Sequence, residues 1–420
     1  MAPVLRALAG SPAVHLAEVF VAWFPVLFAF LAINASRQFF LDRRGIVTQR
    51  LEPAGSDVAD AQERWPLLTV LLPVHNGAST VELTLLDLAR LDWPVLEVIV
   101  VDDGSTDGTG AVLDRWADVS SLLRVVHKAE NEGKSAALND GLALARGELV
   151  LICDDDVVVP PETAALLAAQ LVHHDDLAGV TANPRMVRTG RLIEKLQAIE
   201  FSATVSTQRR GHAAWGRIST LSGVCTLFRA EALRAVGGFD PTQPAEDIEL
   251  TWRLQTRGWR VGYEPHAAVG TVPAPGVRAW FRQRRRWAAG LVRALQANGS
   301  RALRPANAAV WPLLLEATAS IVWCHLLVAL TVLWLCCLAA GVPPVGNGVL
   351  IGAWGTVTVC VAVTQILWGM HLDAEDDPGV RRVRWYVPLF PLAYWWMMSM
   401  TVVSVTLPTL CTPRRRERWE

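Results

Sequence analysis

The stretch that decides the fold is Leu149-Val150-Leu151-Ile152-Cys153-Asp154-Asp155-Asp156, a short apolar run followed at once by three acids. Upstream of it, further apolar runs alternate with stretches of helical pattern. The runs are 67–72, 96–101 and 123–126, and the helical stretches are 81–91, 109–116 and 134–145. This alternation is typical of a parallel sheet covered by helices. We therefore predict a Rossmann-like α/β domain with a parallel sheet.

The ends of these predicted strands carry the polar residues that could form a site. In such sheets, ligands bind outside the carboxyl ends of the strands, so residues 73–76, 102–105 and 154–156 should face one crevice. Three adjacent carboxylates repel one another unless a cation lies between them. Asp154 and Asp156 point to the same side of the chain, and carboxylates are ligands for Mg²⁺ or Mn²⁺. An acidic turn before a helix at 160–162 explains the same acids equally well.

Three other segments have both a structural and a functional interpretation. Asp102 and Asp103 end a predicted strand and either bind a nucleotide or cap the next helix. Glu246 and Asp247 precede a predicted helix, where they either balance its dipole or supply a general base. The run 280–287 holds four arginines among three aromatic residues, which suits anionic lipid headgroups as well as a diphosphate and a sugar ring.

Composition and spacing exclude several classes of function. The formal net charge of -1 gives no basic field, so we expect no nucleic acid partner. Gly133-Lys134-Ser135 is not a phosphate-binding loop, because Lys128 stands where that motif needs glycine. No G-x-G-x-x-G follows a strand, and the seven cysteines contain no C-x-x-C pair. The chain is thus neither a P-loop enzyme nor a typical dinucleotide oxidoreductase, and we expect reduced cysteines.

Part of the chain is predicted to lie in a lipid bilayer. Hydrophobic residues make up 52% of the chain and charged residues only 19%. Charge-free runs at 19–36 and 317–372 are long enough for a retained anchor and for two spans divided by the turn at 341–348. A third run, 385–413, contains Pro388, Pro391 and Pro408, which argue against a straight helix.

Basic residues beside these runs predict the orientation. Arg37, Arg43, Arg44 and Arg50 follow the anchor, which places the polar middle region in the cytoplasm. The basic tail at 414–418 favours the same side, whereas one anchor plus three crossings would put it outside. We therefore expect a hairpin or an interfacial path for 385–413. The predicted organisation is an anchor (1–36), a catalytic domain (37–275), interfacial helices (276–310), transmembrane helices (311–413) and a tail (414–420).

Taken together and in this order, the motifs resemble those of the processive family 2 glycosyltransferases, and most closely the bacterial poly-β-1,6-N-acetylglucosamine synthases. The resemblance covers roughly residues 66 to 419, including the stretches 182–200, 221–224 and 413–419. Its motifs are Pro73-Val74-His75-Asn76, Asp102-Asp103-Gly104-Ser105, Asp154-x-Asp156, Glu246-Asp247 and Gln283-x-x-Arg286-Trp287.

The resemblance implies a GT-A type catalytic domain inserted between transmembrane helices, and it implies a role for each matching residue. Asp247 matches the catalytic base. Asp154 and Asp156 match the acids that hold the donor and its metal, Mg²⁺ or Mn²⁺. Matches for donor binding are Asp103, Lys134, Gln283, Arg286 and Trp287, and matches near the acceptor are Ser222, Gly223, Glu246 and Trp287.

The implied reaction is an inverting transfer from a UDP-sugar, without a covalent enzyme intermediate. The resemblance further implies a bacterial inner-membrane protein with several spans and a cytoplasmic catalytic domain. Its implied partners are a growing polysaccharide, the lipid bilayer and a small accessory membrane subunit. This sequence departs from the family at Ala245, where threonine is usual, and at Gly77, where an acid is usual.

Two other functions fit the same residues. A single-addition transferase would glycosylate a membrane lipid with the same carboxylates and release it afterwards. A catalytically silent protein would bind nucleotide or carbohydrate without turnover. The length of the product distinguishes the single-addition transferase from a synthase. Turnover of a donor sugar distinguishes both enzymes from the silent protein.

Overall fold

The computed structural model describes residues 1–43, 65–172, 174–342 and 353–419, and it contains one mixed sheet of eight strands in the order β3-β2-β1-β4-β7-β6-β8-β5. Four strands, β3-β2-β1-β4, are parallel neighbours, which confirms the predicted α/β fold. The strands are β1 (Leu68–Val74), β2 (Leu96–Asp102), β3 (Leu123–His127), β4 (Leu149–Cys153), β5 (Val157–Val158), β6 (Leu177–Met186), β7 (Cys225–Arg229) and β8 (Arg260–Thr271).

The second half of the sheet departs from a purely parallel arrangement. Strand β7 runs antiparallel to both β4 and β6, β5 runs antiparallel to β8, and β6 and β8 are parallel. The prediction covered strands only as far as residue 153. In addition, strands buried on both faces show no alternation of polar and apolar residues, so their sequence does not distinguish parallel from antiparallel pairing.

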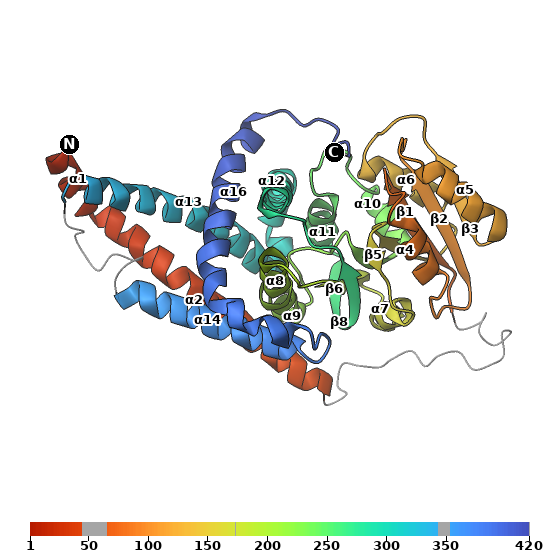
Figure 1. The fold of residues 1–420 in the computed structure, drawn as a ribbon, viewed down its shortest axis with the longest axis horizontal. Coiled ribbons are helices and arrows are strands. Elements are labelled where there is room, and N and C mark those ends of the chain that lie inside the picture. Colours follow the sequence, from red (N-terminus) through yellow and green to blue (C-terminus); the bar gives the residue numbers. More distant parts are fainter. Residues whose placement is uncertain (44–64, 173, 343–352, 420) are drawn as a thin grey trace.

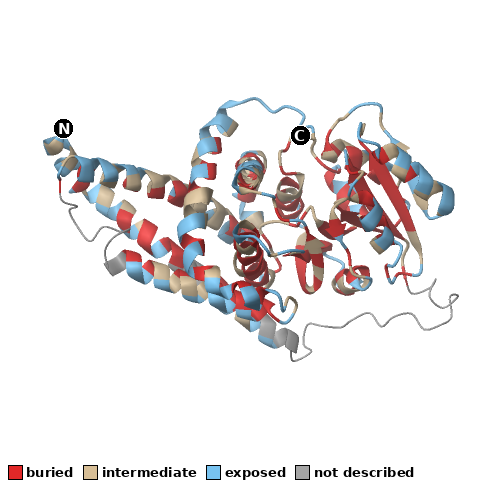
Figure 2. Cartoon of the chain, in the orientation of Figure 1, coloured by how far each residue is buried: buried red, intermediate tan, exposed pale blue. Residues whose placement is uncertain are grey.

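Helices cover both faces of the sheet, and this explains why its central strands β1 and β4 are mostly apolar. Val70 and Leu72 of β1 contribute to one core cluster, whereas Leu71 contributes to the other. The covering helices are α4 (Val81–Leu88), α5 (Thr109–Val119), α6 (Lys134–Leu144), α7 (Thr163–Val172), α10 (Ala230–Val236) and α11 (Glu246–Thr256). In Figure 2 most strands of this domain are buried, whereas the edge strand β3 is not.

A helical arm projects from the sheet domain (Figure 1). Its long helices are α2 (Pro12–Arg43), α13 (Trp311–Ala339) and α14 (Ala353–Asp373), with the short α1 (Ala2–Ala9) at the tip. The arm meets the domain through α8 (Leu192–Ile199), the π-helix η1 (Glu200–Ser206), α9 (Thr207–Ala213), α12 (Val277–Ala302), η2 (Pro305–Val310), α15 (Val380–Val383), η3 (Arg384–Leu389) and α16 (Phe390–Cys411).

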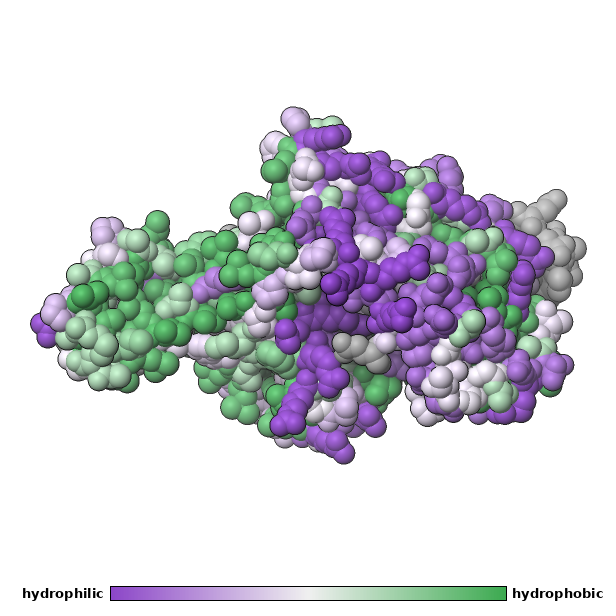
Figure 3. All heavy atoms as spheres, turned by 90° about the horizontal axis from the view of Figure 1, so that it is seen from above, coloured by the Kyte–Doolittle hydropathy of each residue, from purple (hydrophilic) through white to green (hydrophobic). Residues whose placement is uncertain are grey.

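Apolar side chains cover the arm, whereas polar ones gather over the sheet domain (Figure 3). Three helical stretches are long and apolar enough to cross a membrane, namely Pro305–Ala339, Gly355–Asp373 and Val380–Cys411. A fourth candidate is the pair Ala2–Ala9 and Pro12–Pro25, which is bent by 57°. The chain is therefore a membrane protein.

The structure corrects two expectations about the apolar segments. The first helix runs from Pro12 to Arg43 and so extends beyond the predicted 19–36 at both ends. The hairpin considered for 385–413 is wrong, because α16 is one helix of 22 residues. Its prolines permit this, since Pro391 lies in the first turn, where no backbone donor is lost, and Pro408 lies near the end. The predicted turn at 341–348 lies mostly outside the described residues, as do Arg44 and Arg50.

Helix α16 crosses the arm instead of running along it (Figure 1). Its first residue, Phe390, packs with Trp280 and Ile199 of the domain side. Just past its other end, the carbonyl of Thr412 accepts a hydrogen bond from Arg293 of α12 (2.8 Å). Both ends of α16 thus lie on the domain side of the arm.

Candidate active site

Lys134 joins the end of one strand to the start of a helix far away in sequence. As the first residue of α6, it places its Nζ 2.6 Å from Asp154 Oδ1, just beyond β4. The same Nζ lies 3.0 Å from Glu246 Oε1, at the start of α11. The structure therefore brings two predicted acids, Asp154 and Glu246, to the half-buried ammonium group of Lys134.

Asp247 is fixed beside this group by backbone donors. Its Oδ2 accepts a hydrogen bond from the Gly223 N–H (2.9 Å), and its Oδ1 accepts one from the Ile248 N–H (2.8 Å). A Cβ at position 223 would lie 3.0 Å from Lys134 Nζ and 3.4 Å from the Asp247 carboxylate. Glycine at this position therefore permits the close approach of the loop to the acids. Neighbouring Ser222 is buried, and its N–H donates to Thr181 Oγ1 (2.9 Å).

Three charged groups of this cluster have different pKa shifts because their surroundings differ. Burial and the neighbouring Glu246 raise the pKa of Asp247 to about 6. Burial works against the charged form of Glu246 as well, but Lys134 and Arg286 lower its pKa below the usual value. Although burial opposes its charge, Asp154 and Glu246 hold the pKa of Lys134 above its usual value. Of the two acids at the start of α11, Asp247 is therefore the one whose pKa is raised toward neutral pH.

The acids after β4 also repel one another. Burial and its neighbours Asp156 and Asp154 raise the pKa of Asp155 to about 7, and burial and Asp154 raise that of Asp156 to about 6. A divalent cation would relieve this repulsion, and Asp154 and Asp156 are the carboxylates that fit it. Three or more His, Cys, Asp or Glu side chains do not converge into such a site anywhere in the described residues. A metal here would therefore need further ligands, such as donor phosphates.

Asp155 itself occupies the space left by Gly77. A Cβ at position 77 would collide with Asp155 Oδ2, which also accepts a hydrogen bond from Thr80 Oγ1 (3.3 Å). The acid that the family resemblance places after Asn76 is absent from this chain. The carboxylate of Asp155 lies at that place instead.

Asp103 lies beneath the crevice and not on its surface. Its carboxylate is fully buried and accepts hydrogen bonds from the N–H groups of Gly133 (2.7 Å) and Glu132 (3.1 Å). The alternative role as a helix cap is filled by another acid, since Asp107 accepts the Thr109 N–H at the start of α5 (3.1 Å). Asp103 therefore positions the loop before Lys134.

The Gln283-x-x-Arg286-Trp287 motif lies on α12, next to a buried ion pair that the sequence interpretation missed. Arg284 is fully buried and pairs with Glu200 of η1, which also accepts the Trp280 Nε1–H (3.1 Å). The Arg284 guanidinium lies 3.8 Å from the centre of the Trp287 ring and so fixes it from one side. Gln283 Oε1 accepts a bond from Arg284 (2.8 Å). No local pattern marks this pair, because its members are 84 residues apart.

Arg286 is exposed and differs in this respect from Arg284. Its charge is one of the causes that lower the pKa of Glu246, so it lies within electrostatic reach of the acid cluster. One arginine of the run is structural, and another faces the crevice.

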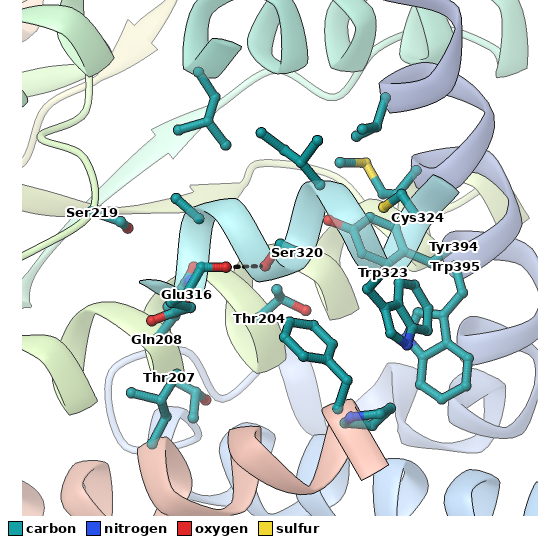
Figure 4. A pocket seen from close by; sticks show the side chains of 18 of the residues that line it. Thr204, Thr207, Gln208, Ser219, Glu316, Ser320, Trp323, Cys324, Tyr394 and Trp395 are labelled. Carbon is teal, nitrogen blue, oxygen red and sulfur yellow. Dashed lines mark hydrogen bonds between the residues drawn. The ribbon is translucent and has the colours of Figure 1, made fainter. Parts of the chain in front are cut away.

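A cavity of about 370 Å³ lies between this site and the helical arm. Trp287, Ile248 and Ser219 line it near the acid cluster, and most of its remaining walls are apolar. Figure 4 shows Glu316 and Ser320 of α13 on one side of it, and Tyr394 and Trp395 of α16 on another. The cavity therefore leads from the neighbourhood of Asp247 into the arm.

Residues 69–237 match the family model described as Glycosyl transferase family 2. Together with the curated relatives below, this match supports the predicted family 2 glycosyltransferase domain. Poly-beta-1,6-N-acetyl-D-glucosamine synthase of Staphylococcus aureus (strain COL) is 28% identical over 307 residues, which cover 73% of this chain and 73% of the relative. The protein of the same name from Staphylococcus epidermidis is 29% identical over 261 residues, covering 62% and 63%.

Among solved structures, the chain is similar to the mannosyltransferase PcManGT from Pyrobaculum calidifontis, determined in complex with GDP-Man and Mn²⁺. The TM-score is 0.66 at 23% identity, and the match covers 97% of this chain and 99% of that one. This similarity shows that the two proteins share a fold, both in the α/β domain and in the helices around it.

Proposed function

We propose that the chain polymerises N-acetylglucosamine from UDP-N-acetylglucosamine into a β-linked exopolysaccharide, at the cytoplasmic face of a bacterial inner membrane. The observation that carries this proposal is the convergence of Asp154, Lys134, Glu246 and Asp247 at the strand ends of a family 2 domain. The sugar and the polymeric product rest on the printed names of the curated relatives.

Asp247 is the proposed general base. In its charged form it would accept the proton of an acceptor hydroxyl while that oxygen attacks C1 of the donor sugar. The bond from C1 to the diphosphate breaks as the new glycosidic bond forms, and the electron pair leaves with UDP. Attack from the opposite face inverts an α-linked donor into a β-linked product.

The proposed donor-side residues neutralise the diphosphate. Mg²⁺ or Mn²⁺, held by Asp154 and Asp156, would supply Lewis acidity for the leaving group. The mannosyltransferase of the same fold was solved with Mn²⁺, which supports a divalent ion. Lys134 holds Asp154 in place, and exposed Arg286 is free to contact a phosphate bidentately. Gln283 and Trp287 would complete this side of the donor site.

The proposed acceptor path runs past Trp287 into the cavity. An aromatic face suits the apolar side of a sugar ring. Ser222 and Gly223 lie on the loop whose Gly223 N–H donates to the Asp247 carboxylate. Export of the product and help from a small accessory subunit belong to the same proposal.

A second candidate acceptor is a membrane lipid, and the apolar walls of the cavity favour it. Apolar and aromatic residues from α2, α13, α14 and α16 dominate these walls, and such a lining suits an acyl or isoprenoid chain. In this case one sugar would be transferred and the lipid product released.

The test uses the full chain, purified in detergent with Mn²⁺, and a panel of UDP-sugars. We expect UDP release with UDP-N-acetylglucosamine, a product of high molecular weight, and loss of both with EDTA. UDP release that requires an added lipid, with a product one sugar larger, would favour the second candidate. UDP release with a different donor sugar would contradict the proposed substrate, and no release with any donor would contradict the proposed activity.

A further inference from the structure

The basic segment, residues 413–419, lies across the nucleotide end of the crevice. It follows α16 and is held at its start by the bond from Arg293 to the Thr412 carbonyl. Further along, the Glu417 N–H donates to the Pro241 carbonyl (2.9 Å), in the loop that leads to α11. The Glu417 carbonyl abuts Gly133, where a Cβ would collide with it. The segment therefore connects the loop before Lys134 with the loop before Glu246.

Trp419 ends this segment against the motif that follows β1. Its ring lies over the His75 ring, with centroids 6.2 Å apart and planes inclined by 29°. Its N–H donates to Asn131 Oδ1 (3.3 Å), and its carbonyl accepts from Asn131 Nδ2 (3.3 Å). Asn131 Nδ2 also lies 3.2 Å from His75 Nε2, so the two side chains form one surface.

These contacts are of the kind that a pyrimidine base would make. Uracil offers a flat ring for stacking and an edge on which an N–H donor is flanked by carbonyl acceptors. Trp419 presents a flat ring to His75 and both a donor and an acceptor to the amide of Asn131. Trp419 thus contacts His75 and Asn131, the two side chains that would hold a uracil at this strand end.

The attachment of Trp419, at the end of the segment, is weak. Residues 413–418 are exposed, and only Trp419 is half-buried. Its bonds to Asn131 are long for N–H···O contacts, and the Arg416–Glu132 pair (3.5 Å) is largely exposed, so it contributes little. A ligand that competes for His75 and Asn131 would need little free energy to release it.

Resting on the proposed use of UDP-sugars, we propose that Trp419 occupies the nucleobase subsite of the resting enzyme, and that the donor nucleotide displaces the basic segment. The segment is then an autoinhibitory strap. Because a nucleotide binds only the open fraction, docking of the strap in about four of five molecules would weaken apparent binding about 5-fold.

The first test measures the dissociation constant of UDP for the full chain by calorimetry. Trp419→Ala should bind UDP about 5-fold more tightly than wild type. Trp385→Ala is the matched control, because Trp385 is 76% exposed on η3, and it should bind as wild type does. Equal or weaker binding by Trp419→Ala would overturn the strap. Absence of UDP binding by wild type would overturn the proposed function together with it.

The second test follows tryptic cleavage after the arginines at 414–418 by mass spectrometry of the wild-type chain. Displacement predicts faster cleavage when UDP is added, since the segment is then undocked. Slower cleavage would mean that the segment closes over the nucleotide, and an unchanged rate would mean that it does not respond. Either result would overturn the proposal.

Discussion

Asp247 and Lys134 show how single residues set the chemistry of the crevice. Burial and Glu246 raise the pKa of Asp247 to about 6, whereas Lys134 and two backbone donors oppose that rise. Only the charged form of Asp247 can accept a proton. The acid is therefore tuned so that it is charged at neutral pH but still basic enough to take a proton from a hydroxyl.

This tuning predicts the pH dependence of the reaction. The turnover rate should rise with pH up to about pH 6 and then level off, because Asp247 loses its proton in that range. Lys134→Gln removes a charge that lowers this pKa, so the rise should move to higher pH. The pH profile of UDP release in both variants measures this. A profile that does not move would show that another group controls the rate.

Asp155 predicts a pH dependence of stability with the opposite sign to that of a salt-bridged acid. Its pKa is raised from the usual 3.8 to about 7 in the folded chain, so its favourable contribution is fully present only below pH 3.8 and is lost as the pH rises from there through 7. Asp155→Asn should therefore raise the melting temperature at pH 8 and change it little below about pH 4. Glu231→Gln, at an exposed acid, is the control. A lower melting temperature of Asp155→Asn at pH 8 would contradict the assignment.

At the scale of elements, the contact between η1 and α12 fixes the motif helix against the domain. Glu200 and Arg284 are both buried and paired, and Trp280 donates to the same carboxylate. A π-helix at such a contact is often associated with a functional site. Here it presents Glu200 to α12, one residue before the Phe201 that lies edge-on to Trp287.

Removal of one partner of this pair should be costly. Glu200→Ala leaves the Arg284 charge buried without a partner, which typically costs about 3–5 kcal/mol. Chemical denaturation should show this loss, whereas Glu231→Ala at an exposed position should change stability little. A loss below about 1 kcal/mol would mean that the pair is hydrated and contributes as a surface pair does.

The local elements were largely predictable from sequence, but the contacts between distant segments were not. Strand β4 has the predicted bounds, and α6 differs by one residue, because apolar runs bounded by acids or glycine mark such elements clearly. The Lys134 bridge and the Glu200–Arg284 pair depend on tertiary folding. The exact role of Asp103 also depended on burial, which no motif reports.

At the scale of the whole molecule, α2, α13 and α14 run between the tip of the arm and the domain. Ala9 and Cys337 share a cluster at the tip, while Ala35 and Leu372 pack together near the domain. Helix α16 has both ends on the domain side. If α16 lies in the membrane interface, three crossings place residues 413–419 on the same side as the catalytic domain, in agreement with their basic charge.

This topology can be tested in intact cells with a membrane-impermeant maleimide. In a background without other cysteines, Cys411 at the exposed end of α16 should stay unlabelled until the membrane is opened. Leu338→Cys, exposed near the tip of the arm, should be labelled from outside. Labelling of Cys411 in intact cells would show that α16 crosses the membrane.

The role of the acid cluster at the strand ends can be measured directly. Turnover of UDP-N-acetylglucosamine and the affinity for UDP are measured in the same preparations of wild type, Asp247→Asn and the surface control Glu231→Gln. If Asp247 is the general base, Asp247→Asn should lower kcat by about 10²–10⁴-fold and change UDP affinity less than about 3-fold. A kcat of Asp247→Asn near that of Glu231→Gln would show that Asp247 is not the base.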